Sequence, residues 1–203
     1  MKLQVITQKR LQKTMLLFFL FFALSIVKAQ QSIWKIDPSH SKINFGISYF
    51  KIGEIKGNFD KYEGAFISDN ENFENTSVNI SIETASINTN QKARDKHLKT
   101  KDFFDAETHP KITFESTSMS KVLEKEYKLK GNFTMTGITK PIELKAIYKG
   151  SFLHPRYKKK VAIFKINGTI FRKDFKVGTN YPPAKLALGN NVVLDAEIHL
   201  TKQ

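Results

Sequence analysis

The sequence predicts an all-β protein, an antiparallel up-and-down β-barrel of about eight strands. Apolar and polar residues alternate along at least seven segments, so each would bury one face as a strand. Most of the segments are joined by short turns, which is typical of antiparallel sheets. A β-sandwich remains the alternative. The length of the segments, about nine residues for the longest, favours the barrel.

The expected strands follow one another along residues 32–200. In order they cover 32–36, 42–49, 78–82, 111–115, 127–135, 141–148, 162–170 and 192–200. Asp37-Pro38 should end the first strand, since Pro cannot continue a central ladder, and residues 136–139 should form a turn. Residues 53–66 contain three glycines and three aromatic residues but no clear alternation.

Residues 91–105 are the one densely charged interval of the chain. They predict a short helix between Gln91 and Thr100, followed by the apolar pair Phe103-Phe104. Burial of two Phe side chains would contribute roughly 3–6 kcal/mol, so this pair should plug or line one end of the barrel.

Residues 1–29 have the three parts of a secretory signal peptide. A basic start precedes an apolar run of about 13 residues, which is short for a membrane-spanning helix. Small residues then stand at Val27 and Ala29, the two positions that signal peptidase reads. We expect cleavage between Ala29 and Gln30, which leaves residues 30–203 as a single periplasmic or secreted domain. A retained membrane anchor is the alternative.

Composition narrows the functional classes. The net charge of +14 falls to +9 when the five positive charges of the signal are removed. The remaining lysines are mostly scattered along strands, so no nucleic-acid partner is expected. A basic domain is suited to transient contact with an anionic membrane surface. The chain has no Cys, which excludes disulfides, a lipid-modified cysteine, a thiol nucleophile and thiolate metal sites.

Several small residues fall on the expected inward faces: Gly131, Ala146, Ala162, Gly168 and Ala196. An eight-stranded barrel is just wide enough to fill itself with side chains or to hold one small ligand. The small residues either leave volume for an apolar ligand or offset large neighbours. Both explanations stay open.

Catalysis and metal binding have little support in the sequence. A hydrolase could use His40 or His97 with Asp37, Asp95 or Asp102, but no Gly-x-Ser-x-Gly turn exposes a nucleophile. Residues 37–41 fit a turn whose side chains bond the backbone. The five histidines lack metal-ligand spacing. We therefore predict no catalytic residue, no metal and no cofactor. The alternatives are an envelope hydrolase or a membrane-spanning β-barrel, although the chain lacks a terminal aromatic residue.

Several motifs occur in a fixed order along the predicted mature chain. They are Trp34-x-Ile36-Asp37-Pro38-Ser39-His40-Ser41, Gly57-x-Phe59, Arg94-Asp95-x-His97-Leu98, Asp102-Phe103-Phe104-Asp105, Pro110-x-Ile112-Thr113-Phe114, Gly131-x-Phe133-Thr134-Met135-x-Gly137-x-Thr139-Lys140-Pro141 and Phe171-Arg172-x-Asp174-Phe175. With these motifs the chain from Trp34 onward resembles the YceI-like family, exported lipid-binding proteins with a lipocalin-like barrel.

The resemblance implies non-catalytic binding, storage or transport of a long-chain, polyisoprenoid-like amphiphilic lipid in the barrel of an exported bacterial protein. Register then places the lipid tail among Phe45, Ile47, Ile82, Phe114, Phe133, Leu144, Phe164 and Leu194. Charge makes Arg94, His97 and Arg172 the candidates for its head group. Residues 150–160 are unusually basic for such a domain. They either favour anionic head groups or form a solvated loop, and we expect the loop. A homodimer stays open.

Overall fold

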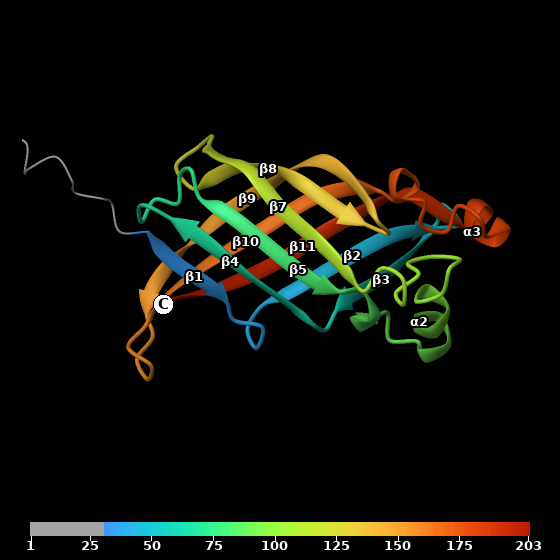
Figure 1. The fold of residues 1–203 in the computed structure, drawn as a ribbon, viewed down its shortest axis with the longest axis horizontal. Coiled ribbons are helices and arrows are strands. Elements are labelled where there is room, and N and C mark those ends of the chain that lie inside the picture. Colours follow the sequence, from blue (N-terminus) through green and yellow to red (C-terminus); the bar gives the residue numbers. More distant parts are fainter. Residues whose placement is uncertain (1–30) are drawn as a thin grey trace, which may run out of the picture. The chain divides into compact units, whose positions relative to one another are not determined.

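Eleven strands form one antiparallel sheet that pairing of β1 with β11 closes into a barrel (Figure 1). The computed structural model describes residues 31–203, and the predicted signal peptide with its cleavage site lies outside them. The strands are β1 (Ser32–Ile36), β2 (Lys42–Tyr49), β3 (Gly53–Phe59), β4 (Tyr62–Ser68), β5 (Ser77–Glu83), β6 (Ile87–Asn88), β7 (Lys111–Lys121), β8 (Glu126–Met135), β9 (Ile138–Leu153), β10 (Lys160–Phe171) and β11 (Leu188–Lys202).

Three of the wall strands are interrupted, which explains how eleven strands make an eight-stranded wall. β11 pairs with β1 near its C-terminal end, where Trp34 lies opposite Lys202, and with β2 earlier, where Phe45 lies opposite Leu194. In the same way, β4 pairs with β1 and β3 pairs with β2, so β4 and β3 together make one strand of the wall. β5 pairs with β4 and β6 pairs with β3, so β5 and β6 make the next one. The prediction of an up-and-down barrel of about eight strands is therefore confirmed.

The break between β1 and β2 is the turn predicted at Asp37-Pro38. The backbone N–H of Ser39 donates to Asp37 Oδ1 over 2.9 Å. Ser41 Oγ accepts a hydrogen bond from the His199 N–H over 2.9 Å, in place of a ladder carbonyl. Side chains thus satisfy backbone groups that the interrupted ladder leaves unpaired.

β3 and β4 were not predicted, because glycines interrupt their alternation. A side chain at Gly57 would collide with the ring of Phe45, and one at Gly64 with the backbone of β5. Glycine is required where a neighbour approaches this closely, so the strand pattern is lost from the sequence at these positions.

The interior is filled in one half and hollow in the other. The filled half is an aromatic cluster centred on Phe164, whose ring centroid lies 5.0 Å from that of Phe73 and 5.2 Å from that of Tyr148. Ala146 and Ala162 are completely buried beside it. In this half of the barrel, the small inward residues make room for large neighbouring side chains and leave no volume for a ligand.

The outer surface of the barrel carries charged residues in pairs. Lys145 lies 2.7 Å from Glu126, and Lys165 lies 3.2 Å from Asp195. The apolar faces of the strands therefore point into the barrel and the polar faces outward. Within the basic segment at residues 150–160, residues 154–159 form the loop that connects β9 to β10, and the remaining residues belong to the ends of these two strands.

The helical segments α2 (Lys92–Leu98), η2 (Arg172–Phe175) and α3 (Pro182–Ala187) lie toward the same end of the barrel (Figure 1), whereas η1 (Thr84–Ser86) joins β5 to β6. The short helix predicted between Gln91 and Thr100 is α2. Asp95 Oδ1 anchors it by accepting from the backbone N–H and the hydroxyl of Thr89, over 2.9 and 2.6 Å. No helix within residues 31–203 is long and apolar enough to cross a membrane.

Candidate functional site

A cavity of about 360 Å³ occupies the hollow half of the barrel, beneath α2, η2 and α3. Apolar side chains from strands around the barrel line it. Five of the predicted tail-binding residues are among them: Phe45, Ile47, Ile82, Phe133 and Leu194. Further strand residues complete the wall, including Ile43, Ile55, Phe59, Ile112, Met135, Ile170 and Val192. The size and apolar lining are those of a small-molecule site.

The other three predicted tail-binding residues do not line this cavity. Phe164 is the centre of the aromatic cluster in the filled half. Phe114 packs over Gly131, and Leu144 packs over Gly168. Register places these side chains inward correctly, but packing against the residues beside them fills the space at their level. The apolar interior is therefore not a tunnel along its whole length.

The predicted Phe plug forms part of the cover of the cavity. Phe103 and Phe104 both line the cavity. The ring of His97 on α2 packs edge-on against Phe103 and Tyr181, with centroids 5.1 and 4.8 Å apart. Tyr181 precedes α3, so these three residues join the two helical covers across the end of the barrel.

α3 and the segment before it were missed in the sequence, although both line the cavity. Val177, Tyr181, Pro183, Ala184 and Ala187 all contribute to the lining. The one available signal was Pro182-Pro183, since Pro is favoured in the first turn of a helix. A helix of six residues has no apolar periodicity long enough to be read.

Arg172 lines the cavity, but backbone carbonyl groups use most of its donors. Nε donates to Gly189 O over 2.7 Å, Nη1 to Val177 O over 2.7 Å, and Nη2 to Ala184 O and Leu188 O over 3.1 and 3.3 Å. The residue is 2% exposed, and burial lowers the pKa of the guanidinium from its ordinary value. Through these hydrogen bonds the guanidinium of Arg172 holds η2, α3 and the start of β11 together.

Arg94 is the candidate with donors left for a ligand. Its Nε donates to Thr89 Oγ1 over 2.6 Å and its Nη2 to Thr89 O over 2.8 Å. A guanidinium has five N–H donors, so three remain uncommitted within residues 31–203. The side chain comes from α2 and is one of the few charged groups in the lining of this mainly apolar cavity, as recognition of a polar head group requires.

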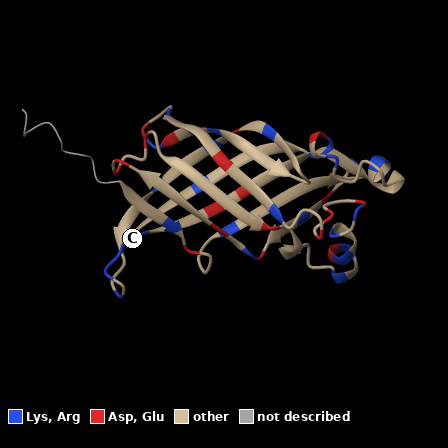
Figure 2. Ribbon diagram, viewed as in Figure 1, with Lys and Arg blue, Asp and Glu red and all other residues tan. Residues whose placement is uncertain are grey.

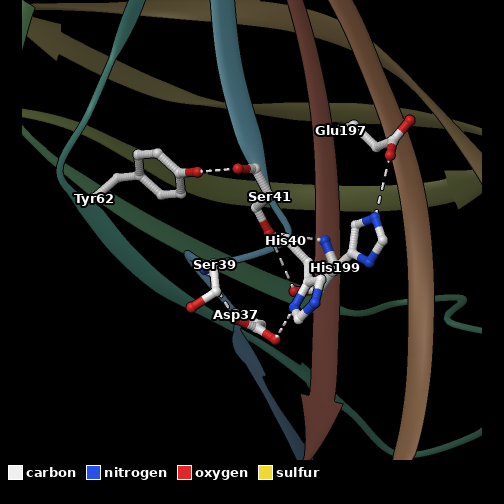
Figure 3. A network of polar contacts seen from close by, with 7 residues as sticks. All are labelled: Asp37, Ser39, His40, Ser41, Tyr62, Glu197 and His199. Carbon is white, nitrogen blue, oxygen red and sulfur yellow. Dashed lines mark hydrogen bonds and ion pairs between the residues drawn. The ribbon is translucent and has the colours of Figure 1, made fainter. Parts of the chain in front are cut away.

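The two histidines of the hydrolase alternative each bond a carboxylate. His97 Nε2 lies 2.8 Å from Asp102 Oδ2, and His40 Nδ1 lies 2.7 Å from Asp37 Oδ2. Figure 3 shows His40 in the turn between β1 and β2, close to the ring of His199. A Ser or Thr nucleophile would need a hydrogen bond to one of these imidazole rings, which would act as its base. Within residues 31–203, neither ring hydrogen-bonds a Ser or Thr hydroxyl group.

The Asp37 carboxylate is held in its charged form by this turn. Burial alone would raise its pKa, but hydrogen bonds from His40 and from the Ser39 N–H outweigh that effect. The pKa of Asp37 therefore lies below its ordinary value. The described part of the chain contains no group of three or more His, Asp or Glu side chains arranged to hold a metal ion.

Comparison with known proteins identifies the family. The profile of the YceI-like domain matches residues 34–200. A UPF0312 protein of Pectobacterium carotovorum is 37% identical over 150 residues, which cover 73% of this chain and 76% of the relative. Protein YceI of Salmonella newport is 36% identical over 165 residues, covering 81% and 85% of the two chains.

Solved structures with the same fold extend the comparison. The YceI protein of Campylobacter jejuni superimposes with a TM-score of 0.67 at 30% identity, covering 75% of this chain and 87% of its own. BcnA of Burkholderia cenocepacia gives 0.71 at 22% identity, with 82% and 98% covered. A polyisoprenoid-binding domain from Saccharophagus degradans gives 0.63 at 12% identity, with 84% and 98% covered, a likeness of fold alone. The chain belongs to the YceI-like domain family.

Proposed function

We propose that this protein binds a long-chain amphiphilic lipid of the polyisoprenoid class, non-catalytically, with its apolar tail in the cavity. The apolar cavity of about 360 Å³ in a barrel that is otherwise well packed is the observation that carries the proposal. Apolar walls offer water few hydrogen-bond partners, so an apolar occupant is favoured over water in this cavity.

The chemistry of the ligand follows from the lining. Apolar side chains on the walls accept a hydrocarbon chain, with about 0.8 kcal/mol gained for each CH₂ group buried. Arg94 in the lining favours an anionic head group such as phosphate or carboxylate. The name of the Saccharophagus degradans domain supports a polyisoprenoid as the class to test first.

The inward direction of the apolar faces favours a ligand inside the barrel over contact of the barrel wall with a bilayer. We include in the proposal that the protein is exported after cleavage near Ala29-Gln30, and that it stores or carries the lipid in the bacterial envelope. N-terminal mass spectrometry of protein from the envelope fraction tests the export step.

The central experiment is organic extraction of natively purified protein, followed by mass spectrometry of the extract. We expect a prenyl-chain lipid at a fixed ratio to protein. A Leu194→Trp variant, which fills the cavity, should carry much less lipid while remaining folded. Preparations that are repeatedly empty and take up neither a prenyl phosphate nor a prenol would contradict the proposal. Turnover of an ester substrate, lost in a His97→Ala variant, would instead favour the hydrolase alternative.

A further inference from the structure

The covered end of the barrel carries exposed apolar side chains that do not line the cavity. We call Phe50 and Ile52 of the β2–β3 turn, together with Leu186 of α3, the tip surface. Ile52 is 95% exposed, Leu186 83% and Phe50 54%. The Phe50 N–H donates to Ala187 O over 2.7 Å, so the turn and α3 lie side by side. Ligand binding inside the barrel does not account for this exposure.

The β2–β3 turn has a backbone that its sequence does not favour. Phe50 and Lys51 have φ of 48° and 65°, and the Ile52 N–H donates to Tyr49 O over 3.3 Å. Positive φ at both central residues is the type I′ geometry, for which Asn-Gly is strongly preferred. The chain instead places an aromatic and a cationic side chain there. The geometry of the turn therefore does not explain why these two side chains are present.

The charge around the tip surface is mainly positive. Lys51 lies within the turn and Lys185 beside Leu186, and both are exposed without an ion-pair partner in residues 31–203. Exposed Lys173 and Lys176 lie at η2 and are also unpaired there, although Asp174 adds one negative charge between them. Figure 2 shows further basic positions on α2 at this end, together with the acidic Asp95 of that helix. Apolar side chains among lysines are typical of surfaces that bind anionic bilayers.

We propose that the tip surface docks this end of the barrel onto an anionic lipid bilayer. Phe50, Ile52 and Leu186 enter the interface, and the lysines contact the head groups. The inference extends the proposed lipid-binding function. Tyr49 and Ala187, the neighbours of these residues in the chain, line the cavity, so docking brings the cavity to the membrane that supplies or receives the ligand.

The loop between β9 and β10 provides a matched control. It too exposes an aromatic residue among basic ones, with Tyr157 62% exposed and the Arg156 guanidinium 5.5 Å from the centre of its ring. The neighbouring strands lead to the filled half of the barrel, since Phe164 lies opposite Tyr148 in the β9–β10 ladder. Docking through this loop would not bring the cavity to the bilayer.

The experiment is co-sedimentation of the full protein with vesicles of phosphatidylcholine, with or without phosphatidylglycerol. Wild-type protein should bind the anionic vesicles and bind less as NaCl rises from about 0.1 to about 1 M, because the Debye length falls from about 10 to about 3 Å. Ile52→Asn combined with Leu186→Asn should weaken partitioning at least about tenfold. Phe50→Asn with Lys51→Gly should also weaken it, in a turn that folds at least as readily. Tyr157→Asn should leave binding unchanged.

Lipid content is measured by mass spectrometry on the same preparations. The docking proposal is overturned if wild-type protein ignores anionic vesicles, binds neutral ones equally well, or loses binding through Tyr157→Asn rather than through the tip variants. Protein that carries lipid but does not bind vesicles overturns the docking alone. Protein that binds anionic vesicles through the tip surface but neither carries nor takes up lipid supports docking and overturns the proposed function.

Discussion

Replacing Arg172 should release the cover of the cavity. An Arg172→Met variant keeps most of the apolar volume but removes the donors to four backbone carbonyl groups. Two of them, Val177 O and Ala184 O, belong to buried hydrogen bonds, and each unpaired buried group costs about 1–3 kcal/mol. The other two bonds are only partly buried, so water can replace the lost donor. We expect a total loss of about 3–5 kcal/mol.

Arg94→Met is the matched control, because Arg94 also lines the cavity but bonds Thr89 alone. For a domain of this size, about 4 kcal/mol corresponds to a fall in Tm of roughly 8–16 °C, and the control should fall far less. Thermal unfolding followed by circular dichroism measures both variants. Hydrogen exchange should also show α3 and residues 176–181 less protected in the Arg172 variant. If Arg172→Met matches the wild type in Tm and exchange, the guanidinium does not fasten the cover and a ligand-binding role becomes the better explanation.

Three further predictions concern the ligand and the turn. Phe133→Asp places a carboxylate at a position 8% exposed, and should lower Tm and empty the cavity, whereas Phe133→Leu should do neither strongly; an unchanged lipid content in the Asp variant would contradict the location of the site. Arg94→Met should weaken binding of a prenyl phosphate about tenfold or more but not of a prenol, in a titration of lipid-stripped protein; equal loss for both would refute the head-group role. Asp37 has a lowered pKa in the fold, so its contribution to stability is present above about pH 4 and is lost as pH falls through the folded-state value. Urea unfolding between about pH 3 and 6 should therefore show a smaller pH dependence in Asp37→Asn, and identical slopes would count against the depressed pKa.

Much of the wall could be read from the sequence because a strand that buries one face repeats with a period of two. The alternation at Ile43, Phe45 and Ile47 predicts that the three share one face, and all three line the cavity. β3 and β4 were missed because close neighbours require glycine at Gly57 and Gly64, and these glycines interrupt the alternation of apolar and polar residues. The short helix and Phe plug were readable because charge and apolar bulk are concentrated within residues 91–105.

By itself, the sequence determined the class of fold, the inward faces and the family, since local periodicity and ordered motifs carry that information. Only the tertiary structure decided which inward residues surround open space. Phe133 and Phe164 both face the interior, yet Phe133 borders the cavity and Phe164 fills the opposite half. That difference depends on which side chains meet across the barrel, and residues far apart in the chain supply them. The same holds for Arg172, whose guanidinium turns toward carbonyl groups that the fold brings to it.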